Sequence, residues 1–215
     1  DSIKTFNKLF GLYPYSTFSV VKTNFIYGGM EYPNLVMISD ACEDYKDYQN
    51  VIIHETAHQW WYGLVGNNEY DYGWLDEGLT DYSTALFYKY NPDYEIKFED
   101  VIKNTTNSYV TFVEIYTKVL GKVDTTMNRP LNKYNTEPEY VYIAYVKGVL
   151  LFDSLRENCG DEKFLKALST YFKTNKFKNV TPDHLIGAFE KTMSCEMKGF
   201  FDSWINGKVV IYNVE

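Results

Sequence analysis

Two histidines four residues apart, His54 and His58, constrain this chain more than any other feature of its sequence. On an α-helix this spacing puts both imidazoles on one face, where one Zn²⁺ with bonds of about 2.0–2.1 Å can bind both. Glu55 lies between them, turned by about 100° around the helix axis. From there its carboxylate can reach over the metal without binding it, as a general base does. The sequence therefore predicts a helix that carries a metal site.

A catalytic zinc site needs a third protein ligand and one open position, and Glu77 in Trp-Leu-Asp-Glu-Gly fits as that ligand. Eighteen residues separate it from His58. That length is enough to end one helix, turn, and begin a second helix beside the first. Two histidines, one glutamate and a water form a hydrolytic site for one zinc ion per chain. A chance pair of helical histidines is disfavoured, because two of the three histidines in the chain lie here.

Composition narrows the classes of partner. With 215 residues, of which 45% are hydrophobic, the chain can bury a core as a single domain, 1–215. A formal charge of −8 argues against a nucleic-acid partner, which would need a basic face. No apolar run reaches about 18 residues, so no membrane span is expected. The first residue is Asp1 and not Met, which favours a piece of a longer, multidomain protein.

The hydrophobic pattern predicts a mostly α fold with a small N-terminal β portion (α+β). Branched residues at 19–24 and 34–39 indicate strands, which places the β-containing part at about 12–40. The part from about 44 to 206 is expected to be helical. Its first four helices are expected at 44–64, 74–90, 92–120 with a break near 104–107, and 138–158.

Two further carboxylates are candidates for the site. Glu31 follows a Gly-Gly pair, which lets the backbone come close to a ligand, and its carboxylate is a natural partner for a substrate ammonium. The alternative is a turn carboxylate that faces water. Asp81 lies one turn after Glu77 and could orient a zinc-binding histidine through its second ring nitrogen, or it could be exposed to solvent.

Together, three motifs resemble those of the aminopeptidase N family, a branch of the gluzincin metallopeptidases. HETAHQWW followed by WLDEG resembles its zinc signature, GGMEYP at 28–33 its Gly-x-Met-Glu-Asn motif, and AYVKG at 144–148 its Tyr-x-x-Gly segment. The similarity runs from about residue 3 to about 206. Tyr32 departs from the pattern, because the family has Asn at this position.

The resemblance implies a thermolysin-like catalytic domain and a set of residue roles. Tyr145 would stabilise the oxyanion, whereas the sequence without the resemblance favours one more aromatic that packs on the core. The motif around Glu31 would contact substrate through Gly28, Gly29 and Met30, with the Glu31 carboxylate anchoring the substrate amine. The implied partners are a peptide with a free N-terminus and flanking domains of the same protein that this segment lacks.

The implied reaction is hydrolysis of the N-terminal residue from a peptide. Two alternatives stay open. One is a gluzincin endopeptidase, which would share the zinc chemistry but have no amine anchor. The other is a zinc-stabilised peptide-binding domain without turnover, which would have no need of Glu55 or Tyr145.

Overall fold

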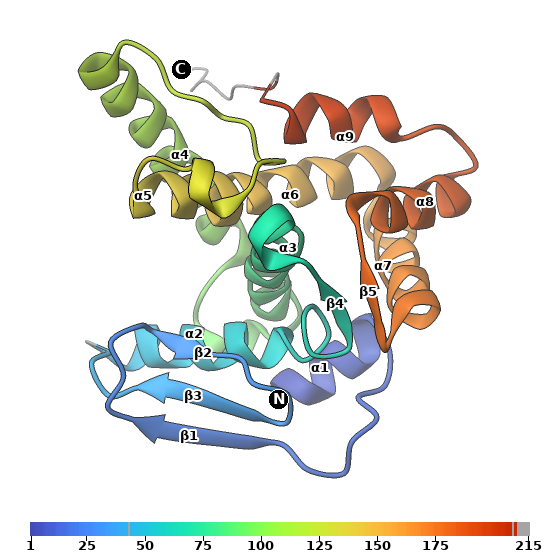
Figure 1. Cartoon of the computed structure of the whole chain (residues 1–215). Coiled ribbons are helices and arrows are strands. Elements are labelled where there is room, and N and C mark those ends of the chain that lie inside the picture. The colour runs from blue at the N-terminus through green and yellow to red at the C-terminus, as the bar shows by residue number, and fades with distance from the viewer. Residues whose placement is uncertain (43, 208, 210–215) are drawn as a thin grey trace.

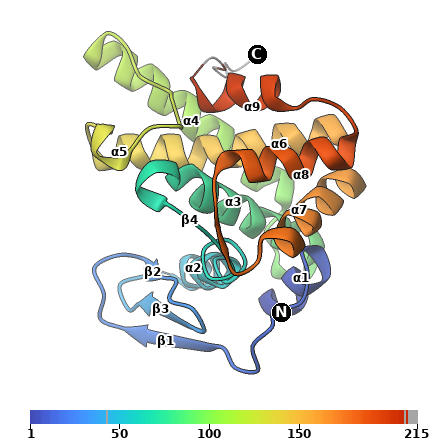
Figure 2. The same cartoon turned by 45° about the vertical axis from the view of Figure 1, so that its right-hand side comes forward.

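The computed structural model of the chain describes residues 1–42, 44–207 and 209, and Figure 1 shows that helices make up most of it. The expected mostly helical fold with a small N-terminal sheet is confirmed. A three-stranded sheet lies along one side of helix α2 (Tyr45–Ala57), and α3 (Glu69–Tyr90) runs on the other side (Figures 1 and 2). Helix α2 therefore lies between the sheet and α3 (Figures 1 and 2).

The sheet consists of β1 (Ser19–Thr23), β2 (Gly29–Met30) and β3 (Leu35–Ser39), in the order β1-β3-β2. The central strand β3 pairs parallel with β1 and antiparallel with β2. Val36 and Ile38 alternate along β3 and are fully buried, as expected for a strand with one face on the core. The short β2 thereby lies at one edge of the sheet.

Helix α2 begins where Asp44 caps it, with its carboxylate accepting hydrogen bonds from the backbone of Lys46 and Asp47. It ends at Ala57, so the prediction of a helix to Leu64 was wrong. Beyond it the chain turns back, and the N–H of Gly63 donates to the carbonyl of His58 at 2.8 Å. In this turn two consecutive tryptophans, Trp60 and Trp61, are both buried in the core.

Helix α3 is buried almost all round, as expected of a central helix. It has a kink at Tyr72 and ends before Pro92, as predicted. A Cβ added to Gly78 would lie 2.9 Å from the Cα of Gly148. The backbones of α3 and α6 (Lys147–Cys159) therefore touch at a glycine pair, Gly78 and Gly148.

Helix α4 (Phe98–Leu120) runs without interruption, so the expected break near 104–107 was wrong. The hydroxyls of Thr105 and Thr106 donate to carbonyls four residues earlier, at 2.8 and 2.9 Å. These bonds satisfy the two threonines inside the helix instead of competing with it. The helix ends at Gly121, which has a φ of +77°.

The predicted helix at 138–158 has three parts. It begins with α5 (Glu137–Tyr140), continues through a π-helical segment, η3 (Val141–Val146), and ends with α6. A π-helical turn holds one residue more than an α-helical turn and is common at functional sites. Tyr145 lies within this segment.

The described part of the chain contains further helices and 3-10 turns. They are α1 (Ser2–Leu9), the 3-10 turns η1 (Pro92–Tyr94) and η2 (Leu131–Lys133), α7 (Asp161–Asn175), α8 (Pro182–Met193) and α9 (Lys198–Ile205). A second sheet, not predicted, pairs β4 (Val65–Asn67) in parallel with β5 (Lys178–Val180). Across the described residues, none of the helices is long and apolar enough to cross a membrane.

Candidate metal centre and active site

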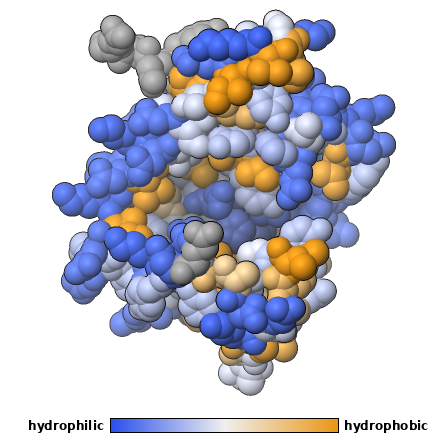
Figure 3. Space-filling view, turned by 90° about the vertical axis from the view of Figure 1, so that its left-hand side faces the viewer, coloured by the Kyte–Doolittle hydropathy of each residue, from blue (hydrophilic) through white to orange (hydrophobic). Residues whose placement is uncertain are grey.

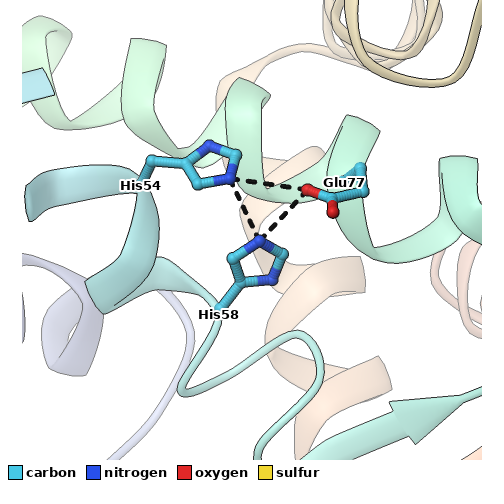
Figure 4. A group of neighbouring side chains, drawn as sticks. All are labelled: His54, His58 and Glu77. Atoms are coloured by element: carbon cyan, nitrogen blue, oxygen red, sulfur yellow. Dashed lines mark hydrogen bonds and ion pairs between the residues drawn. The ribbon is translucent and has the colours of Figure 1, made fainter. Parts of the chain in front are cut away.

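His54, His58 and Glu77 point toward one another, the two histidines from the end of α2 and the glutamate from α3 (Figure 4). The Nε2 atoms of the two histidines are 3.0 Å apart. Glu77 Oε2 lies 3.1 Å from Nε2 of His58 and 3.4 Å from that of His54. The structure thus brings the three predicted ligands together at one point.

The other ring nitrogens identify the tautomers. Nδ1 of His58 lies 3.0 Å from the carbonyl oxygen of Trp61, which can only accept a hydrogen bond. Nδ1 of His54 lies 2.7 Å from the carboxylate of Asp81, so the structure brings this predicted residue into contact with the histidine. Both Nδ1 atoms therefore carry the ring proton, and both Nε2 atoms turn a lone pair toward Glu77.

Three acceptors that face one another require a cation. Burial lowers the pKa of His58, but the nearby Glu77 charge raises it more, so that the pKa is about 9. Protons, however, fit this cluster poorly, because the 3.0 Å between the two Nε2 atoms leaves no room for an N–H on each. Tetrahedral zinc with bonds of about 2.0–2.1 Å would hold its ligand atoms about 3.3 Å apart. The measured separations of 3.0, 3.1 and 3.4 Å fit this ion.

Glu55 lies beside the cluster and is 5% exposed. Its Oε2 has no hydrogen-bond partner within the described part of the chain. Burial raises the pKa of this carboxyl to about 7, which is the range suited to a group that takes and returns a proton at neutral pH. Gly29 on β2 packs so closely that an added Cβ would overlap the Glu55 carboxylate. The glycine at this position therefore makes room for the glutamate.

Glu31 follows β2 and is 9% exposed, so the alternative of a solvent-facing turn carboxylate does not describe it. One acceptor atom each from Glu31, Glu55 and His58 lies within 4.8 Å of the other two. Gly28, Gly29 and Met30 lead into it, and the two glycines line the cavity. The structure thus brings a second buried carboxylate close to the general-base candidate.

Tyr145 reaches the cluster from the π-helical segment. Its ring stacks on that of His54, with centroids 6.3 Å apart and planes 10° apart. Burial and the nearby Glu77 charge raise the pKa of the Tyr145 phenol well above its ordinary value. The hydroxyl therefore stays protonated and can donate a hydrogen bond.

These residues line a cavity of about 330 Å³ between the sheet and the segment that holds Tyr145. Figure 3 shows the face on this side, with a hollow whose depth is hydrophilic. Tyr27 just before β2, Val51 on α2 and Val141 in the π-helical segment add apolar surface. The cavity can hold a short chain end against the metal ligands.

Sequence reasoning missed two residues that support the site. Thr80 Oγ1 lies 3.1 Å from Nδ1 of His58, and the buried side chain of Gln59 contacts the turn after Glu31. The available signal was a polar residue next to a predicted ligand, followed by two tryptophans, at a position where its burial requires hydrogen-bond partners.

Comparison with known proteins places this geometry in a family. The model of the peptidase family M1 domain matches residues 1–204. The chain is 27% identical over 201 residues to leucine aminopeptidase 2 of Lodderomyces elongisporus, covering 83% of this chain and 31% of that protein. It is 28% identical over 191 residues to aminopeptidase N of Lactococcus lactis, covering 84% of this chain and 21% of that protein. The chain thus spans less than a third of the length of these curated relatives.

Solved structures show the same fold. An M1 zinc metallopeptidase from Deinococcus radiodurans superposes with a TM-score of 0.74 at 20% identity, covering 98% of this chain and 44% of that one. Leukotriene A4 hydrolase from Saccharomyces cerevisiae superposes with a TM-score of 0.73 at 21% identity, covering 100% of this chain and 35% of that one. The resemblance inferred from the three motifs is confirmed, and the expected zinc agrees with the similarity to a zinc metallopeptidase.

Proposed function

The chain belongs to peptidase family M1, and on this premise we propose that it forms the catalytic part of a zinc aminopeptidase. The observation that carries the proposal is the convergence of three acceptor atoms, 3.0–3.4 Å apart, beside a buried carboxylate with an unpartnered oxygen. The names of the curated relatives, a leucine aminopeptidase and an aminopeptidase N, support the same activity.

His54, His58 and Glu77 hold one zinc ion, and Asp81 orients His54 through Nδ1. When bound, this ion polarises the substrate carbonyl and makes water more acidic. The proposal draws support from the tautomers, since the Asp81 carboxylate and the Trp61 carbonyl keep both Nε2 lone pairs free for a metal.

Glu55 accepts the proton of the attacking water and passes it to the nitrogen of the leaving peptide. Its burial and its unpartnered Oε2 support this role, because a carboxylate held away from water is ready to accept a proton. Tyr145 donates a hydrogen bond to the carbonyl oxygen as that oxygen becomes an anion. Its stacking on His54 supports this position next to the metal ligands.

Glu31 binds the α-ammonium of the substrate, and the backbone of Gly28, Gly29 and Met30 lies along the substrate. Glu31 has no ion pair with another described residue, and a buried carboxylate without a cationic partner is costly, so an ammonium that enters the cavity is favoured beside it. This anchor restricts cleavage to the first peptide bond. The partners are thus a peptide with a free N-terminus and, because the relatives are much longer, the remaining domains of a longer protein.

The test is metal content together with hydrolysis of aminoacyl substrates that carry a free or an acetylated amine. We expect one zinc per chain and cleavage of the free-amine forms alone. Glu55→Gln should keep the zinc and lower kcat by about 10²–10⁴-fold, because the amide cannot accept a proton.

Other results would select the alternatives. Cleavage of acetylated peptides would indicate an endopeptidase and would remove the amine anchor from the mechanism. Zinc and peptide binding that are both unaffected by Glu55→Gln, without turnover in the full-length protein, would indicate a binding domain.

A further inference from the structure

Gln59 is the residue directly after the metal-ligand candidate His58, and its side chain is 1% exposed. Both ends of its side-chain amide form hydrogen bonds with the segment 31–34. Its Oε1 accepts from the N–H of Asn34 at 2.8 Å. Its Nε2 donates to the carbonyls of Glu31 and Tyr32, each at 3.3 Å. One side chain thus binds three backbone groups of the segment that begins with Glu31.

That segment is a tight turn. The N–H of Leu35 donates to the carbonyl of Tyr32 at 3.0 Å. Pro33 and Asn34 fill its centre, and the φ of +66° at Asn34 is typical of a type II turn. On its outer side the carbonyl of Asn34 accepts from Ser19 at the start of β1. Gln59 forms the hydrogen bonds of the backbone groups that face the helix, which are the carbonyls of Glu31 and Tyr32 and the N–H of Asn34.

The position of the Glu31 carboxylate depends on this turn. Within the described part of the chain, no hydrogen bond holds that carboxylate. Its place near Glu55 therefore follows from the course of its own backbone, and Gln59 fixes that backbone from the carbonyl of Glu31 onward. The end of α2 at Ala57 turns Gln59 away from the helix axis and toward the sheet.

We propose that Gln59 is a positioning residue that sets the distance between the amine anchor Glu31 and the metal centre. This inference rests on the proposed function, in which Glu31 binds the substrate ammonium. Gln59 is joined by one peptide bond to the metal ligand His58, and its side chain holds the turn that follows Glu31. The position of the amine anchor is therefore coupled to that of the metal centre. Aminopeptidase selectivity then depends on a residue that does not touch the substrate.

The test compares two inhibitors that differ by the amine alone. Leucine hydroxamate carries an α-amine beside its metal-binding group, and 4-methylpentanohydroxamic acid lacks it. The ratio of their inhibition constants for the full-length, zinc-loaded protein measures the contribution of the anchor. Gln59→Met keeps the size of the side chain and removes all three hydrogen bonds.

We expect Gln59→Met to bind one zinc per chain and to lower the preference for the amine by roughly tenfold, from the loss of well-placed hydrogen bonds. The affinity for the inhibitor without the amine should hardly change. Gln59→Asn, which withdraws the amide by one methylene, should lower the preference less and covers the case in which Gln59→Met folds poorly.

Asn175→Leu is the matched control. Asn175 is also a buried amide that donates to a backbone carbonyl, that of Tyr171 at 3.0 Å, but it lies at the end of α7. It should lower the melting temperature and leave the amine preference unchanged.

Three results would overturn the inference. An unchanged preference in both Gln59 variants would show that the turn holds Glu31 without the amide. Equal weakening of both inhibitors would show a structural role alone. A wild-type protein without any preference would remove the anchor role of Glu31, and the inference with it, while hydrolysis of free-amine substrates would still decide the proposed function.

Discussion

Two buried polar clusters of this molecule differ in how their charges are balanced. In the first, Tyr82 donates to Asp153 at 2.9 Å, and Arg156 binds Tyr82, Asp153 and Asp161 at distances of 2.7–3.0 Å. In this cluster each of these hydrogen bonds pairs a donor with an acceptor. In the second, the two Nε2 atoms and Glu77 present acceptors to one another, and one Glu55 oxygen has no hydrogen-bond partner among the described residues. The first cluster is complete within the chain, whereas the second needs a cation from outside.

This difference shows how a scaffold network can be told from a binding site. A buried network in which every donor and acceptor is paired adds rigidity and does not need a ligand. A cluster whose acceptors face one another costs free energy unless a ligand completes it. Burial and ionisable side chains are common to both, so the direction of each donor and acceptor carries the information.

We expect the largest difference between the two clusters from one matched change in each, carboxylate to amide. Glu77→Gln should reduce zinc from one ion per chain toward zero and abolish hydrolysis, because the third ligand is lost. Asp153→Asn should keep zinc and lower the free energy of unfolding by roughly 3 kcal/mol, since Arg156 loses a buried partner. Metal analysis and denaturant unfolding measure the two effects. Equal zinc loss in both variants would mean that the clusters are not independent.

A tyrosine in each cluster gives the second test. Tyr145→Phe should lower kcat by about 10²–10³-fold with little change in KM, as expected when one donor to an oxyanion is removed. Tyr82→Phe should leave kcat unchanged and cost about 1–3 kcal/mol of stability, because two buried groups lose a partner. Steady-state kinetics on both variants decide the matter. A normal kcat for Tyr145→Phe would leave this tyrosine as a packing residue.

Each cluster has an aspartate at its edge, Asp81 beside His54 and Asp161 beside Arg156. Asp81→Asn should weaken zinc binding by about 10–100-fold, because His54 loses the carboxylate that orients its ring. Asp161→Asn should leave zinc affinity unchanged and reduce stability by about 1 kcal/mol or less, since this carboxylate is partly exposed. Competition with a zinc chelator measures both affinities. Equal affinities in the two variants would exclude a role for Asp81.

Lys147 gives a third case, a fully buried amine that donates to the carbonyls of Thr125 and Trp204 at 2.7 Å each. Burial lowers its pKa to about 7, far below that in the unfolded chain. Between pH 7 and about 10 the unfolded chain therefore holds a proton that the folded chain lacks. Stability should rise with pH across this window by about 1 kcal/mol per pH unit at most, and the penalty is complete below pH 7.

Lys147→Met should remove this rise. Unfolding of the variant and the wild type, measured from pH 6.5 to 9, gives the difference in slope, from which the contributions of other titrating groups cancel. Parallel curves would mean that the folded protein keeps Lys147 charged.

Much of the site could be predicted because its signals are local. The four-residue spacing of His54 and His58 has one helical outcome, and the eighteen residues before Glu77 fit one turn between two helices. The expected ends at Gly121 and before Pro92 also follow from local backbone chemistry.

The missed features depend on contacts between distant segments. Helix α2 stops at Ala57, and the chain then turns back so that Trp60 and Trp61 pack in the core, which the local pattern does not reveal. The π-helical turn before Lys147 has no signature in composition or periodicity. Gln59 is an ordinary helix former by propensity, and its role becomes visible when the turn after Glu31 lies beside it.

The parallel pairing of β4 with β5 sets an order of assembly during synthesis. β4 joins the two metal-binding helices, but its partner β5 follows more than a hundred residues later. At about 5–20 residues per second, the ribosome makes β5 roughly 5–20 s after β4. During that delay both histidines and Glu77 already exist on the nascent chain, while the segment between them lacks its final support. The segment between the proposed metal ligands therefore gains its strand pairing with β5 after both histidines and Glu77 have been made.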